Sequence, residues 1–182
     1  VLLQCERHAE ALHSLQRTVS SNETDAGTQF SVAKALVRAA ELRRLYEAAD
    51  SQPDPERKLI ATALERARQL GIPIDTTSEW LARAQILVGD TQSSIPTLEA
   101  IGTRTPTSEI YCALAAAYHL SGDYLKAQQS ARWVLDRHPD YLPALLQLSK
   151  IAATEGDSEA EMTVLERAVA FSPDAAISHF ML

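Results

Sequence analysis

The chain has 182 residues, of which 46% are apolar and 5% aromatic, and its formal net charge is -7 at pH 7. This apolar fraction argues against a disordered chain, and an acidic balance without any run of Lys and Arg argues against a nucleic-acid partner. The longest apolar stretch, from Ile110 to Leu120, is too short to cross a membrane. Alanine and leucine dominate the apolar residues, so we expect packed helices rather than sheets.

The N-terminal part of the chain, up to Ile74, predicts helices of unequal length. Residues 1–22 have apolar residues at helical spacing, which predicts one helix. A long amphipathic helix is expected from Gln29 to Asp50. Its apolar face consists of Val32, Ala35, Leu36, Ala39, Leu42, Leu45 and Tyr46. A further helix begins at Asp54-Pro55-Glu56 and stops before Gly71 and Pro73, so residues 23–74 are expected to form an irregular, long helical pair.

Three Gly-Asp pairs then recur at a nearly fixed interval. They are Gly89-Asp90, Gly122-Asp123 and Gly156-Asp157, at intervals of about 34 residues. A proline follows each glycine at one constant distance, at Pro106, Pro139 and Pro173. Glycine permits a tight turn between helices and proline ends a helix, so this period predicts helix pairs stacked into a solenoid.

Alignment of the three units on their glycines gives the same apolar columns in each. Eight residues before the glycine stand Leu81, Leu114 and Leu148, and seven residues before it stand Ala82, Ala115 and Ser149. Nine residues after the glycine stand Leu98, Ala131 and Leu165, and twelve residues after it stand Ile101, Val134 and Ala168. We therefore expect one buried stripe on each first helix and one on each second helix.

This pattern resembles the tetratricopeptide repeat (TPR), a helix-turn-helix unit of about 34 residues, over Asp75 to Leu182. The middle unit matches best, through Tyr111, Leu114, Ala115, Tyr118, Gly122, Ala127, Val134 and Pro139. Ser94 and Glu161 depart from the alanine that the family expects in the Ala127 column, and Gln85 stands where an aromatic residue is usual. These departures weaken the two outer units.

The resemblance implies an all-α fold, a right-handed superhelical α-solenoid of antiparallel helix pairs with about eight helices. Its repeats are residues 75–107, 108–141 and 142–175, with a further helix starting at 176–182. Residues 1–22 form the second helix of a partial unit, and the repeat phase is not maintained across the segment 23–74. Because the chain starts at Val1 and stops inside an apolar stretch, we interpret it as one continuous solenoid from a larger protein.

In this family the first helix of each pair lines a concave groove that receives a peptide or a helix. Carried over residue by residue, the partner-binding groove consists of Glu79, Trp80, Arg83, Glu109, Cys112, His119, Gln147 and Lys150. Between them lie Ile86, Leu87, Ala113, Ala116, Leu146 and Thr154. The family's clamp for chaperone tails is not expected, because its asparagines are missing and Cys112 and Ala116 occupy clamp positions.

The groove residues predict the chemistry of the partner. Trp80 is either an aromatic anchor for the partner or a side chain that packs against the irregular pair, and the sequence does not separate these readings. Arg83 and Lys150 would place two positive charges in the groove. We therefore expect a protein or peptide partner with an apolar anchor and an acidic group.

No catalytic residue, metal site or cofactor is predicted. The chain has no Gly-rich phosphate loop, no Gly-x-Ser-x-Gly and no Cys-x-x-Cys, and Cys5 and His8 lack the second half of a zinc-deaminase motif. Cys112 and His119 are two helical turns apart on one predicted helix. Their separation would be about 10 Å at a rise of 1.5 Å per residue, too far for a nucleophile and its base.

The leading hypothesis is therefore a non-enzymatic scaffold for protein-protein interaction. The alternatives are a substrate-recruiting arm of a larger glycosyltransferase, sulfotransferase or hydroxylase, and a self-associating spacer. Ile177, Phe180 and Leu182 predict a further helix or a homodimer contact at that end of the chain. Two isolated cysteines favour the cytoplasm, with the bacterial periplasm as the alternative, and the excess of Arg over Lys is typical of a GC-rich bacterial source.

Overall fold

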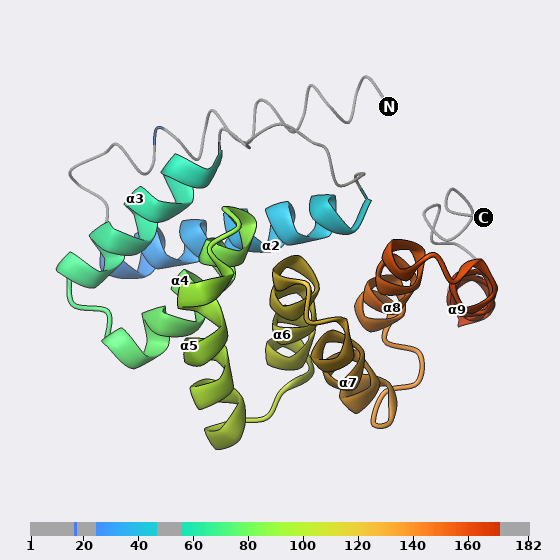
Figure 1. The fold of residues 1–182 in the computed structure, drawn as a ribbon. Helices are drawn as coiled ribbons and strands as arrows, with labels where there is room; N and C mark the ends of the chain where they lie inside the picture. The colour runs from blue at the N-terminus through green and yellow to red at the C-terminus, as the bar shows by residue number, and fades with distance from the viewer. Residues whose placement is uncertain (1–16, 18–24, 47–55, 172–182) are drawn as a thin grey trace.

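The computed structural model describes residues 17, 25–46 and 56–171, and most of them lie in helices. The helices are α2 (Ala26–Tyr46), α3 (Glu56–Gln69), α4 (Ile74–Leu87), α5 (Thr91–Arg104), α6 (Ser108–Ser121), α7 (Tyr124–Leu135), α8 (Leu142–Glu155) and α9 (Ser158–Phe171) (Figure 1). These described ranges contain no strand, and none of their helices has the length and apolarity needed to cross a bilayer. The predicted all-α solenoid of about eight helices is confirmed. The helices expected at residues 1–22 and 176–182 lie outside the described residues, apart from Arg17.

The turn between α6 and α7 shows how each regular pair is formed. Gly122 ends α6 with a φ of 83°, a left-handed conformation that other residues adopt only with strain. The Asp123 N–H donates to the Tyr118 carbonyl at 2.9 Å and closes the end of α6. The Asp123 carboxylate accepts the Lys126 N–H at 3.2 Å and thereby caps the start of α7.

The same turn recurs in the pairs on either side. Gly89 and Gly156 have φ angles of 82° and 76°. The carboxylates of Asp90 and Asp157 accept backbone N–H groups in the first turns of α5 and α9. Each Gly-Asp pair therefore combines a C-cap with the N-cap of the next helix, which places the two helices of a pair antiparallel.

The core between the helices is formed by two of the aligned sequence positions: the small residues seven positions before each glycine and the residues nine positions after it. Ala82, Ala115 and Ser149 are buried at the centres of α4, α6 and α8. On the second helices α5, α7 and α9, Leu98, Ala131 and Leu165 are buried. Small side chains on the first helices allow close approach of the second helices.

The leucine column is buried in the middle unit but exposed in the first. Leu114 of α6 is 5% exposed and packs in one cluster with Leu98 of the preceding unit. Leu148 is half-buried, and Leu81 of α4 is 47% exposed. The preceding α2 and α3 pack instead against the Trp80 side of α4, so Leu81 is in none of the core clusters formed by the described residues.

Helix α2 is long, as predicted, but its buried face differs from the predicted one. It spans Ala26–Tyr46 rather than Gln29–Asp50, and Val32 and Leu36 are buried as expected. Ala35 is exposed. Among the α2 side chains that the structure describes, which end at Glu41, the other buried apolar ones are Phe30, Ala33, Val37 and Ala40. The predicted face residues Leu42, Leu45 and Tyr46 lie outside the described side chains. The buried stripe is displaced because α2 packs against both α3 and α4.

Helix α2 also lies against the first helices of the regular pairs. It contacts α4 and, farther along the solenoid, α8 (Figure 1). The sequence-based expectation puts the partner on the first helices, and α2 covers part of that face. The remaining open part of this face is the candidate site.

Candidate functional site

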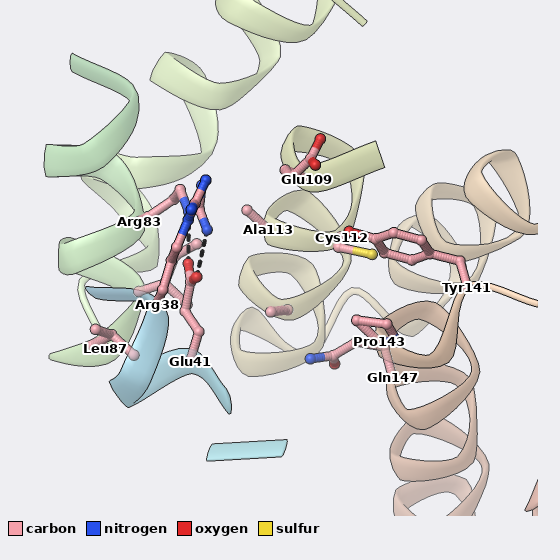
Figure 2. Close-up of a pocket in the computed structure, with 12 residues that line it drawn as sticks. Arg38, Glu41, Arg83, Leu87, Glu109, Cys112, Ala113, Tyr141, Pro143 and Gln147 are labelled. Atoms are coloured by element: carbon pink, nitrogen blue, oxygen red, sulfur yellow. Dashed lines mark hydrogen bonds and ion pairs between the residues drawn. The ribbon is translucent and has the colours of Figure 1, made fainter. Parts of the chain in front are cut away.

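A cavity of about 440 Å³ opens between α2, α4, α6 and α8 (Figure 2). Its apolar lining consists of Ile86, Leu87, Ala113, Ala116 and Pro143. Its polar lining consists of Arg38, Glu41, Arg83, Glu109, Cys112, Tyr141 and Gln147. Apolar walls with a few polar groups are the usual composition of a ligand pocket.

The cavity brings together half of the predicted groove residues. Arg83, Glu109, Cys112 and Gln147 line it, as do the predicted apolar positions Ile86, Leu87, Ala113 and Ala116. Glu79, Trp80, His119 and Lys150 are not among its lining residues. Leu146 is buried in the core against Leu165.

Arg83 is held by two carboxylates and is 7% exposed. Its Nε and Nη2 donate to the two carboxylate oxygens of Glu41 on α2, and its Nη1 donates to Glu79 at 3.0 Å. Burial alone would lower the pKa of the Arg83 guanidinium, but the hydrogen bonds and charge of Glu41, followed by those of Glu79, raise it. Arg83 is therefore a structural cation that joins α2 to α4, and its charge is already neutralised.

Trp80 lies in the core rather than on the cavity wall. Its side chain is 8% exposed and belongs to the cluster formed with α2 and α3. The guanidinium carbons of Arg83 and Arg38 lie 4.2 and 5.3 Å from its ring centroid. The Trp80 ring thus packs against the irregular pair, which is one of the two alternatives given by the sequence.

His119 and Lys150 lie on α6 and α8 beyond the cavity. His119 Nε2 is 2.9 Å from the Thr154 hydroxyl, and its ring packs obliquely on Tyr124. Thr154 in turn donates to the Lys150 carbonyl. These contacts join the last turns of α6 and α8.

Cys112 and Tyr141 form the wall of the cavity opposite α2. They pack in one cluster, and Figure 2 shows the Cys112 sulfur beside the Tyr141 ring. Burial, with a smaller contribution from the charge of Glu109, raises the pKa of the Cys112 thiol to about 12. The pKa of Tyr141 also rises to about 12, mainly through burial. Both groups are therefore neutral at physiological pH; the thiol is a weak hydrogen-bond donor, and the phenol can both donate and accept.

Four of the lining residues were not predicted. Arg38 and Glu41 come from α2, one helical turn apart on one face, and Tyr141 and Pro143 come from the start of α8. The N-cap position of Tyr141 could have been found from its place just after Pro139, where a second helix ends. Nothing in the local sequence of α2 indicates its contact with α4. The described residues contain no group of three His, Cys, Asp or Glu side chains arranged to bind a metal.

No protein-family model and no curated protein matches the sequence. Among solved structures, the fold is similar to that of YrrB, described as a TPR protein with an unusual peptide-binding site. The TM-score is 0.59 at 13% sequence identity, over 96% of this chain and 86% of YrrB. The chain therefore has a TPR-like fold.

Proposed function

We propose that this protein is a non-enzymatic interaction scaffold that binds a short segment of a partner protein in the cavity between α2, α4, α6 and α8. The observation that carries the proposal is a preformed cavity of about 440 Å³ on the inner face of a TPR-like solenoid. Pockets for drug-sized ligands have volumes of about 300 to 1,000 Å³, so this cavity is large enough for a peptide segment.

The size of the cavity favours a short segment over a long helix. A single helical turn about 10 Å across and 5.4 Å long occupies roughly 420 Å³. The cavity thus accepts about one turn of helix or a few residues of extended chain. A longer helix along the inner face would collide with α2, which contacts both α4 and α8.

The contacts around the cavity support binding without rearrangement. Arg83 joins α2 to α4 through Glu41, and Cys112 on α6 packs with Tyr141 of α8. These contacts hold α2 against α4, and α6 against the start of α8, before a ligand arrives, which lowers the entropic cost of binding. The TPR-like fold shared with YrrB, which is described as peptide-binding, gives further support.

The proposal is tested with a displayed library of random eight-residue peptides selected on the protein. Selected peptides should bind in isothermal titration calorimetry. Gln147→Trp places a large side chain at the cavity wall and should abolish this binding. The matched control is Gln129→Trp on the exposed surface of α7, which should bind normally.

Two outcomes would overturn the proposal. One is a selection that yields no binding peptide. The other is peptides that bind the Gln147→Trp variant as well as the wild type, provided that circular dichroism shows both Gln→Trp variants to be folded.

A further inference from the structure

The charges around the cavity are not equally available to a ligand. Arg83 is bound by the carboxylates of Glu41 and Glu79, and Arg38 is an exposed cation on the α2 side of the cavity, with its guanidinium carbon 5.3 Å from the centroid of the Trp80 ring. Glu109 is exposed, and within the described ranges its carboxylate makes no ion pair and no hydrogen bond. Figure 2 shows it on α6, apart from the pair formed by Arg83 and Glu41. On the wall opposite α2, the charged lining group is therefore the Glu109 carboxylate.

An aromatic ring stands at the same end as this carboxylate. Glu109 and Cys112 are about one helical turn apart on α6, so they are neighbours on one helix face. Cys112 packs with Tyr141, whose ring lines the cavity. Glu109, Cys112 and Tyr141 thus form one continuous wall. A carboxylate near an aromatic ring is a suitable receptor for a cation, through ion pairing and through cation–π attraction.

The raised pKa values of Cys112 and Tyr141 agree with the position of Glu109 beside them. After burial, the negative charges of Glu109 and Glu41 contribute to the raised pKa of Cys112, and Arg83 opposes them only in part. The pKa of Tyr141 responds to the same charges. The whole chain, with a net charge of -7, adds a field that attracts cationic segments.

We infer that the cavity selects partner segments that carry a Lys or Arg side chain next to small or aliphatic residues. The Lys or Arg side chain binds Glu109 and the Tyr141 ring, and the small or aliphatic residues pack against the apolar lining of the cavity. This inference rests on the proposed function and assigns the charge of its ligand. It replaces the sequence-based expectation of an acidic group in the partner, which depended on positive charges from Arg83 and Lys150 in the groove.

Glu109 also has a structural role that a test must separate from ligand binding. It lies in the first turn of α6, where a carboxylate interacts favourably with the helix dipole. Glu109→Gln should therefore lower the thermal melting point slightly even without any ligand. A change in peptide preference is a readout that the helix dipole does not affect.

The experiment repeats the peptide selection on wild type, Glu109→Gln and the control Glu166→Gln, which changes an exposed acid on α9. Peptides selected on wild type and on Glu166→Gln should be enriched in Lys and Arg over the input library, and Glu109→Gln should lose this enrichment. In titration calorimetry, replacing the Lys or Arg of the best peptide by Gln should weaken wild-type binding about 2- to 5-fold, the effect of one exposed ion pair. The difference should shrink at about 0.5 M salt and be absent in Glu109→Gln.

The outcomes distinguish this inference from the proposed function. If the selected peptides require an open cavity, as shown by Gln147→Trp, but are not enriched in Lys and Arg, the charge preference is wrong and the binding site stands. If Lys and Arg are enriched equally on Glu109→Gln, the receptor is wrongly assigned. If no peptide depends on the cavity, both are wrong.

Discussion

The ion pair between Arg83 of α4 and Glu41 of α2 should be highly sensitive to a single substitution. Glu41→Gln preserves the shape of the side chain and one acceptor oxygen but removes the charge. The Arg83 side chain is 7% exposed, so its guanidinium cannot regain water unless α2 moves. Among the described residues, Glu79, which accepts from Nη1 at 3.0 Å, would then be the remaining carboxylate paired with this positive charge.

The magnitude follows from the burial of the two partners. A hydrogen bond to a charged group contributes about 1.5 to 3 kcal/mol, and removing one partner of a fully buried pair costs about 3 to 5 kcal/mol. The Glu41 side chain is 28% exposed and Glu79 remains bound, so the lower range applies. We expect Glu41→Gln to lower the free energy of unfolding by about 2 kcal/mol. Adding Arg83→Met removes the uncompensated charge and should recover most of this loss, except for the attraction to the Trp80 ring.

Urea unfolding followed by circular dichroism measures these differences. The matched control is Glu65→Gln, because Glu65 pairs with Arg68 on the surface of α3, where both side chains are about half exposed. An exposed pair contributes little, so this variant should unfold like the wild type. The reasoning is refuted if Glu41→Gln is no less stable than Glu65→Gln, or if adding Arg83→Met to Glu41→Gln makes the protein less stable still.

Three further substitutions test the repeat. Leu114→Ala should lower the free energy of unfolding by about 2 to 5 kcal/mol, because it truncates a buried side chain. Leu81→Ala in the same column should be nearly neutral, because Leu81 is 47% exposed. Equal losses of stability in urea unfolding would contradict this packing. Gly122→Ala should cost about 1 to 2 kcal/mol at its positive φ, whereas Gly102→Ala inside α5, where a Cβ meets only ordinary contacts, should cause no loss. The Cys112 thiol has a pKa of about 12 when folded against 9.0 when free, so the unfolded chain releases this proton first. Stability should therefore fall as the pH rises from about 9 to 12, less steeply in Cys112→Ser; parallel curves would contradict the burial.

The turns and core columns could be predicted from the sequence because their causes are local. Gly122 is needed for a left-handed turn whatever the rest of the chain does, and Ala115 must be small wherever two helices approach closely. The face of α2 could not be predicted as well. Its apolar residues lie on more than one side of the helix. Ala35 is exposed although it was predicted to be buried, and Val37 is buried although it was not in the predicted face, because the neighbouring helices decide which side is covered. Periodicity gives the spacing of buried residues but not the direction of their neighbours.

In the candidate site, too, the sequence predicts the features with local causes but not those that depend on distant contacts. The carry-over from the TPR pattern placed Glu109 and Cys112 on the inner side of α6, since that assignment depends only on position in the repeat. Trp80 and Arg83 were placed on the inner side of α4 by the same rule, but α2 covers them there. Glu41, the partner of Arg83 on α2, lies 42 residues earlier in the chain, and no local pattern identifies it.

The contact between α2 and α8 changes how the molecule should respond to partial unfolding. In a linear array each repeat touches only its neighbours, so an end unit can open while the others stay folded. Here a helix from the start of the described region is in contact with the last regular pair. Opening that pair removes a contact of α2, and loss of α2 uncovers Arg83 in the first pair. Amide hydrogen exchange in α2, α4 and α8 should therefore occur with similar opening free energies, as in a globular domain.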